Sequence, residues 1–214
     1  MTALRQAIYS PAVFNVGNME QAKAIILTSE DNATDVRWEK ETPYLISLIE
    51  QSIPLNENSV VLDYGCGIGR MSKALIDRFG CSVVGVDISK SMRSLAREYV
   101  DSDRFKVCAP ECLEALNQKF DAAIAIWVLQ HCFDPKATID QIHSGLKSDG
   151  RMFVVNDHHR IVPCREGWVS DGKDVLALIK EKFVGEYGRL DDSIVGQRVT
   201  DCSYWATFQK SEAV

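Results

Sequence analysis

Short apolar runs alternate along most of this chain with segments whose apolar residues recur every three or four positions. The apolar runs predict strands at 59–63, 82–87, 104–108, 120–127 and 151–156. The helical spacing predicts helices at 69–79, from residue 89 onward and at 135–146, with a helical turn at 111–116. Regular alternation of strand and helix predicts right-handed βαβ crossovers and a parallel sheet.

The two ends of the chain show other patterns. Residues 19–27 have helical spacing, and Thr42-Pro43 is typical of an N-cap followed by the first helical residue, in a helix that ends at Ile53-Pro54. Near the other end, a helix is expected at 171–182. Two strand-like runs follow at 183–190 and 203–209, and we expect them to pair antiparallel.

Composition is that of an ordinary globular protein, and it excludes several functions. The chain has 214 residues, of which 46% are hydrophobic and 25% charged, with a net charge of −6 and no basic tract, so nucleic acid is not an expected partner. No apolar run approaches the roughly 18 residues of a membrane span, and the start does not resemble a signal peptide. The seven cysteines are scattered, which favours a reduced protein of the cytoplasm.

The most informative segment joins the first predicted strand to the next helix. The strand ends in Asp63, and glycines follow at alternate positions, Gly65, Gly67 and Gly69. Such a turn lacks β-carbons on one side, so a flat ligand can lie almost against the backbone. The next strand ends in a second acid, Asp87, whose carboxylate could accept both hydroxyls of a ribose.

This order of strand, acid, three glycines, helix, strand and second acid resembles motifs I and II of class I S-adenosylmethionine-dependent methyltransferases. The spacing differs from the G-x-G-x-x-G of dinucleotide-binding proteins. The resemblance covers about residue 35 to the C-terminus. It implies a doubly wound α/β fold with a seven-stranded, mostly parallel sheet in the order 3-2-1-4-5-7-6, strand 7 antiparallel, and helices on both faces. We therefore expect an S-adenosylmethionine-binding methyltransferase domain at 35–214, preceded by an N-terminal helical extension or lid at 1–34.

The resemblance also implies which residues hold S-adenosylmethionine and its product S-adenosylhomocysteine. The expected set comprises Asp63, Tyr64, Gly65, Cys66, Gly67, Gly69, Asp87, Ile88, Met92, Glu111, Cys112 and Trp127. Asp87 could instead cap a helix, Asp63 could bind amides of its own loop, and Met92 could be plain core. Where the family often has an acid that binds the adenine amino group, this chain has Cys108-Ala109-Pro110-Glu111-Cys112, so Glu111 or the Cys112 amide would substitute. Arg70 could pair with the donor carboxylate, although an arginine at a helix edge is usually solvated.

The acceptor chemistry is expected beyond the ends of the fourth and fifth strands. His131 follows the fourth strand, and Asp157-His158-His159 follows the fifth. A hydroxyl acceptor needs a base, for which histidine is the usual residue, so His131, Asp157 and His158 are the catalytic candidates. The same three could instead bind a divalent metal, or serve only the structure.

The end of the fourth strand also bears on the substrate. It lacks the Asn/Asp-Pro-Pro-Tyr/Phe motif of enzymes that methylate nucleobase or glutamine nitrogens, and it resembles the branch that acts on small molecules. Tryptophans 127, 168 and 38 offer flat apolar walls, and the 160–171 loop is long enough for a substrate lid. Two alternatives remain: a non-catalytic donor-binding partner protein, and a nicotinamide-dependent oxidoreductase. Oligomeric state does not follow from the sequence.

Overall fold

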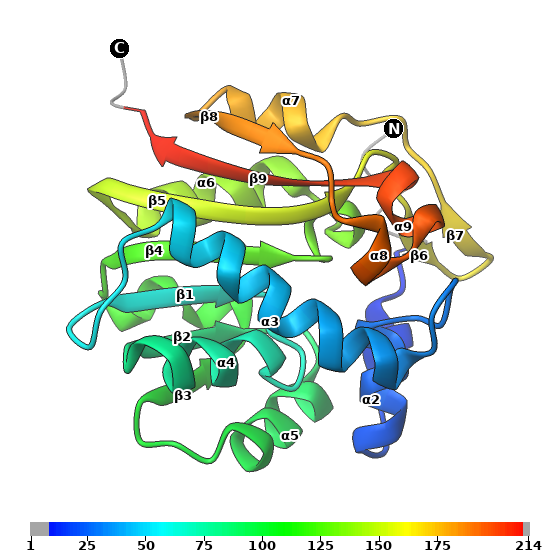
Figure 1. The fold of residues 1–214 in the computed structure, drawn as a ribbon, viewed down its shortest axis with the longest axis horizontal. Coiled ribbons are helices and arrows are strands. Elements are labelled where there is room, and N and C mark those ends of the chain that lie inside the picture. Colours follow the sequence, from blue (N-terminus) through cyan, green and yellow to red (C-terminus); the bar gives the residue numbers. More distant parts are fainter. Residues whose placement is uncertain (1–8, 212–214) are drawn as a thin grey trace.

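A central sheet of seven strands runs through the molecule, with helices on both faces (Figure 1). The computed structural model describes residues 9–211. The sheet order is β3-β2-β1-β4-β5-β9-β8, and only β9 is antiparallel to its neighbours. This is the doubly wound order expected from the sequence, with β9 and β8 in the places of strands 7 and 6.

The strands of the sheet lie close to the predicted ranges. They are β1 (Val60–Tyr64), β2 (Ser82–Val86), β3 (Phe105–Cys108), β4 (Phe120–Ile126), β5 (Leu146–Asp157), β8 (Phe183–Gly188) and β9 (Ser203–Lys210). A separate two-stranded hairpin, β6 (Val162–Cys164) with β7 (Gly167–Val169), occupies the segment that was expected to be a loop. The segment 160–171 therefore contains an antiparallel β-hairpin.

The helices form two layers over the sheet. They are α2 (Met19–Ile26), α3 (Thr34–Ser52), α4 (Arg70–Phe79), α5 (Lys90–Val100), α6 (Pro135–Gly145), α7 (Val175–Lys180), α8 (Asp192–Val195) and α9 (Gln197–Cys202). Short 3-10 turns are η1 (Pro11–Phe14), η2 (Pro110–Cys112), η3 (Glu114–Leu116) and η4 (Leu129–His131). Helices α3 and α4 cover one face of the sheet, and α6 and α7 cover the other (Figure 1).

Helix α3 corrects the prediction that a helix begins at Thr42. The helix starts at Thr34, and Pro43 lies inside it. The Thr42 hydroxyl donates a hydrogen bond back to the Trp38 carbonyl at 2.6 Å instead of capping a helix start. Proline removes one helical hydrogen bond, but buried side chains such as Leu45 and Ile49 hold the helix against the sheet, so tertiary packing prevails.

Helix α7 is shorter than the helix predicted at 171–182. It begins after Asp174, whose carboxylate accepts a hydrogen bond from the Ala177 amide at 3.0 Å. Gly172 has a φ of +70°, a left-handed conformation that does not continue a helix. Helices α8 and α9, between β8 and β9, were not anticipated because each is at most 6 residues long.

Strands β1, β2, β4 and β5 are parallel, so their carboxyl ends lie at the same edge of the sheet. Helices α2 and α9 and the β6–β7 hairpin lie at this edge (Figure 1). Ligands of doubly wound sheets bind beyond these strand ends. Within residues 9–211, no helix has the length and apolar character needed to cross a bilayer.

Phe153 lies in β5 at the centre of the packed layers and is fully buried. Its ring stacks on Trp205, with centroids 6.3 Å apart and planes 13° from parallel. Phe153→Ala is expected to lower the free energy of unfolding by about 3–5 kcal/mol, measured by urea denaturation. Val184→Ala, on the exposed edge strand, should change it by about 0.5 kcal/mol at most. A loss below about 1 kcal/mol for Phe153→Ala would contradict this core.

Candidate active site

A cavity of about 940 Å³ lies beyond the carboxyl ends of the parallel strands. Its walls bring together the glycine loop, the end of β2, the segment after β4, the end of β5 and two segments from the N-terminal part, residues 13–14 and 24–28. Among the predicted site residues, the cavity is lined by Tyr64, Gly65, Gly67, Asp87, Ile88, Met92, Trp127, His131 and Asp157.

The glycine loop fits closely under its neighbours. Gly65 and Gly67 have φ values of +77° and +54°, in the left-handed region that favours glycine. A β-carbon on Gly65 would run into Val128, and one on Gly67 would come within 2.7 Å of Ile26. The alternating glycines therefore serve both the backbone conformation and the close approach of the cavity walls.

Asp87 ties the glycine loop to the second strand. Its carboxylate accepts a hydrogen bond from the Gly67 amide at 2.9 Å and one from the Ser89 amide at 2.8 Å. Burial raises the pKa of this carboxyl, and the two amides oppose that effect. Each oxygen of an ionised carboxylate can accept further hydrogen bonds, so the group can still receive donors from a ligand. Beside it, the apolar side chain of Ile88 is 48% exposed and lines the cavity.

Several residues expected to touch the donor do not line the cavity. Asp63 is buried behind the loop, where it accepts a hydrogen bond from the Ser72 hydroxyl at 2.6 Å. Burial raises the pKa of Asp63 to about 6. Cys66 lies under the loop, and Gly69 forms the N-cap of α4. These residues support the conformation of the glycine loop and do not face the cavity.

The segment after β3 also differs from the expectation. Glu111 and Cys112 lie outside the cavity lining, and Pro110 and Glu114 line it instead. The reason is local: η2 and η3 turn the chain so that Pro110, directly before the expected pair, and Glu114, two positions after it, line the cavity.

A buried ionic cluster supports the wall formed by Trp127. Glu41 is fully buried and accepts hydrogen bonds from Arg37 at 2.9 Å, from Arg70 at 3.4 Å and from the Trp127 indole N–H at 2.7 Å. One carboxylate thus faces two guanidinium groups, so these three side chains carry one excess positive charge, which the buried Asp63 near Arg70 partly offsets. Arg37 also lines the cavity. The sequence reading missed Arg37 and Glu41, although their i,i+4 spacing is an ion-pair signal once α3 is known to start at Thr34.

His131 occupies the rim beyond β4. Its Nδ1 lies 2.9 Å from the carbonyl oxygen of Ile161, which can only accept, so Nδ1 carries the proton and Nε2 holds a lone pair in the neutral ring. Burial, together with the nearby Arg160 guanidinium, keeps the pKa of His131 below its ordinary value. The imidazole is therefore a neutral hydrogen-bond acceptor at pH 7.

The two other catalytic candidates separate. Asp157 lines the cavity, while His158 is exposed outside it with its ring 5.2 Å from that of Tyr204. Across residues 9–211, no group of three or more His, Cys, Asp or Glu side chains is arranged to hold a metal ion, so His131, Asp157 and His158 do not meet as a metal site. Gln130, which the sequence did not single out, lines the cavity beside His131.

Residues 62–154 match the methyltransferase domain family. The matched segment includes the glycine loop, Asp87 and His131. The chain carries a class I S-adenosylmethionine-dependent methyltransferase domain. The cofactor expected from the sequence, S-adenosylmethionine, is the cofactor of this domain family. The family recognised from the glycine spacing and the second acid is thereby confirmed, and the ligand contacts assigned to these residues stay predictions.

Relatives and solved structures agree with this domain. The ubiquinone biosynthesis O-methyltransferase of Coxiella burnetii (strain Dugway 5J108-111) is 33% identical over 115 residues, which are 52% of this chain and 48% of that protein. The chain thus spans about half the length of the curated relatives it matches. The N-methyltransferase NodS from Bradyrhizobium japonicum WM9, solved with S-adenosylhomocysteine, has a TM-score of 0.65 at 18% identity, covering 90% of this chain and 98% of NodS. The geranyl diphosphate C-methyltransferase from Streptomyces coelicolor A3(2) has a TM-score of 0.62 at 15% identity, covering 81% of each chain.

The methyltransferase domain contains an acid whose charge opposes folding. Asp157 accepts no hydrogen bond through its carboxylate from residues 9–211, and burial raises its pKa to about 6. Because the native state then binds this proton more tightly than the unfolded state, stability falls as pH rises from about 4 to about 6. Asp157→Asn removes that loss, so it should raise the free energy of unfolding at pH 8 by on the order of 1–2 kcal/mol, after allowance for partial exposure.

The measurement is urea denaturation of the wild type and the variant at pH 8 and at pH 4, where the gain should be much smaller. The exposed Asp103→Asn serves as the control and should leave the free energy of unfolding unchanged at both pH values. Equal stability of Asp157→Asn and wild type at pH 8 would show that Asp157 is not in a desolvated site.

Proposed function

We propose that this chain transfers a methyl group from S-adenosylmethionine to a small-molecule acceptor. The observation that carries the proposal is the single cavity that joins the glycine loop and Asp87 to His131 and Asp157. Donor-binding and acceptor-binding groups thereby face the same space. Direct displacement of a methyl group requires donor and acceptor to lie in line within one site.

The residues at the donor end fit a nucleoside with an amino-acid tail. Asp87 would accept the ribose hydroxyls, the exposed face of Ile88 would cover the adenine, and Gly65 and Gly67, which line the same cavity, would lie beside the tail. The extra positive charge of the Arg37–Glu41–Arg70 cluster would attract the carboxylate of the tail, so Arg37 takes the role considered for Arg70. Pro110 and Glu114 replace Glu111 and Cys112 as the candidates next to the adenine.

Bound S-adenosylmethionine supplies a methyl group on a positively charged sulfur, which is an excellent leaving group. The chain has to align the acceptor with that methyl and keep water away, and such positioning can contribute roughly 7–11 kcal/mol. Trp127, Phe14 and Trp168 would exclude water from the acceptor. His131, with its free lone pair on Nε2, would take the acceptor's proton.

The family match does not fix the acceptor. It ends at residue 154, so it includes His131 but not Phe14, Asp157 or Trp168. The relatives' name specifies an oxygen acceptor for those proteins, of which the alignment covers about half.

Asp87→Ala tests the donor site. The variant should weaken binding of S-adenosylhomocysteine by tens-fold to thousands-fold, because two charge-assisted hydrogen bonds to the ribose, each worth roughly 1.5–3 kcal/mol, would be lost. The measurement is calorimetric titration, with circular dichroism to confirm that the variant is folded. Asp77→Ala, an exposed acid on α4, is the matched control and should bind as wild type does.

An unchanged dissociation constant in Asp87→Ala would contradict the assignment of the second motif. The same titration with NAD distinguishes the oxidoreductase alternative, which predicts binding of NAD rather than of S-adenosylhomocysteine. Wild-type protein that binds S-adenosylhomocysteine but methylates nothing in a cell extract would support the non-catalytic alternative.

His131→Asn tests the proposed base. A general base contributes typically 10²–10⁴-fold to rate but touches the donor little, so turnover should fall at least about a hundredfold while S-adenosylhomocysteine affinity stays nearly constant. Turnover is followed by mass spectrometry, as the extract metabolite that gains one methyl group. His158→Asn lies outside the cavity and should turn over normally, and normal turnover of His131→Asn would leave His131 a structural role only.

A further inference from the structure

The rim of the cavity beyond β4 and β5 holds polar groups for which residues 9–211 provide no hydrogen-bond partner. The Asp157 carboxylate accepts no hydrogen bond and forms no ion pair with residues 9–211, and its long-range charge neighbours are Arg37, Glu30 and His159. The side-chain carbonyl oxygen of Gln130, Oε1, has no hydrogen-bond partner within the described residues, although only 2% of the residue is exposed. The third group is the Nε2 lone pair of His131.

These three groups are held on one rigid frame. The backbone amide of Gln130 donates to the Asn156 side chain at 3.0 Å, and the same side chain donates to the Asp157 carbonyl at 2.9 Å. Asn156 is fully buried, so it fixes η4, which carries Gln130 and His131, against the end of β5. The backbone segments that carry the three groups are therefore joined through Asn156.

Nearby positive groups already have other partners. Arg37 binds Glu41 at 2.9 Å and the Thr28 carbonyl at 2.9 Å. Arg198 pairs with Glu30 at 3.0 Å. A desolvated carboxylate is costly unless it is paired, so a ligand that brings a positive charge would satisfy Asp157.

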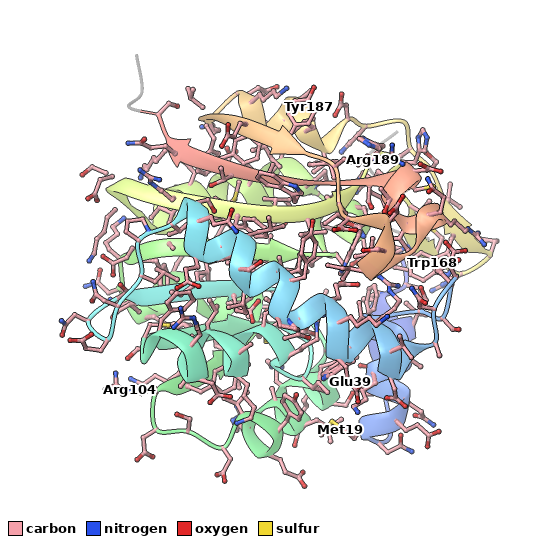
Figure 2. The ribbon with its side chains drawn as sticks, in the orientation of Figure 1. Met19, Glu39, Arg104, Trp168, Tyr187 and Arg189 are labelled. Atoms are coloured by element: carbon pink, nitrogen blue, oxygen red, sulfur yellow. The ribbon has the colours of Figure 1, made fainter. Side chains whose placement is uncertain are left out.

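Aromatic rings enclose the same rim. The His131 ring lies 5.1 Å from Trp168 and 6.1 Å from Phe14, and Trp168 and Phe14 are 6.2 Å apart. Trp168 extends from the β6–β7 hairpin at the edge of the molecule (Figure 2), and 47% of it is exposed despite its size. Aromatic faces attract flat apolar groups and also cations.

We propose that the methyl acceptor is a primary or secondary amine on a flat apolar body, bound as its ammonium form by Asp157, Gln130 and His131. This inference rests on the proposed function and names the substrate class for it. An ammonium offers a positive charge and two or three N–H donors, which match a carboxylate, an amide carbonyl and an imidazole lone pair. A hydroxyl group offers one donor and no charge, so it would leave Asp157 and one further group unsatisfied.

The reaction balances with groups already named. The ammonium loses one proton to His131 Nε2, which leaves a nitrogen lone pair. That nitrogen forms a bond to the methyl carbon while the bond from carbon to sulfur breaks, and its electron pair stays on sulfur. The products are a methylated ammonium and S-adenosylhomocysteine, and the proton on His131 passes to water when the site opens.

The test compares probes of one shape that differ in the reacting atom. Wild-type protein saturated with S-adenosylhomocysteine is titrated by calorimetry with 2-phenylethylamine, 2-phenylethanol and 4-ethylphenol. The amine should bind at least tenfold more tightly than either hydroxyl compound. With S-adenosylmethionine in place of the product, mass spectrometry should detect N-methyl-2-phenylethylamine.

Two variants locate the effect. Asp157→Asn keeps the shape but removes the charge, so it should weaken amine binding about tenfold to a hundredfold and leave binding of the two hydroxyl compounds and of S-adenosylhomocysteine nearly unchanged. Asp103→Asn, an exposed acid outside the cavity, is the matched control and should bind the amine as wild type does.

The outcomes separate this inference from the proposed function. If S-adenosylhomocysteine binds but a hydroxyl compound binds as tightly as the amine, or the amine does not bind, the amine class is wrong and the proposed function stands. If Asp157→Asn binds the amine like wild type, Asp157 is not its anchor and the inference is overturned. If S-adenosylhomocysteine itself does not bind, both proposals fail.

Discussion

The carboxylate of Glu41 is the interaction on which the arrangement of the site depends. It is fully buried on α3 and accepts hydrogen bonds from Arg37, Arg70 and the Trp127 indole. Those partners come from α3, from the start of α4 and from the end of β4, so one acid joins the helix layer to the strand ends. Without it, two buried guanidinium groups would face each other unpaired, which is far costlier than the loss of a surface ion pair.

Trp127 shows how this constraint reaches the cavity. Its φ of +57° is unusual for a bulky residue and costs conformational energy, which the surrounding contacts must offset. The indole hydrogen bond to Glu41 and the backbone hydrogen bond from Trp127 to Val155, at 2.8 Å, hold the residue in that conformation. The strained residue thereby holds a fixed position in the wall of the cavity.

The two ends of the cavity differ in whether the polar side chains that line them have hydrogen-bond partners within the protein. At the proposed donor end, Asp87 already has two amide partners, so the loop is organised before any ligand binds. At the proposed acceptor end, the Asp157 carboxylate and the buried Oε1 of Gln130 have no hydrogen-bond partner among residues 9–211, and burial raises the pKa of Asp157 to about 6. The first arrangement lowers the cost of ordering the loop when a ligand binds, and the second leaves an unfavourable desolvation of Asp157 that a complementary ligand would relieve.

The sequence alone determined the order of strands and helices and the donor loop, because apolar periodicity and the glycine spacing are local signals. It did not determine which side chains meet. Helix α3 passes through Pro43 because of packing that no local window contains, and that longer helix places Arg37 and Glu41 under Trp127. The sequence places His131, Asp157 and His158 equally well after strand ends, yet only His131 and Asp157 line the cavity. The direction of a side chain after a strand end depends on the following backbone, which is set here by η4 and by the pairing of β5 with β9. Tertiary structure decided the proposed acceptor end because its groups come from four separate segments, Phe14, residues 127–131, Asp157 and Trp168, whose distances no sequence spacing encodes.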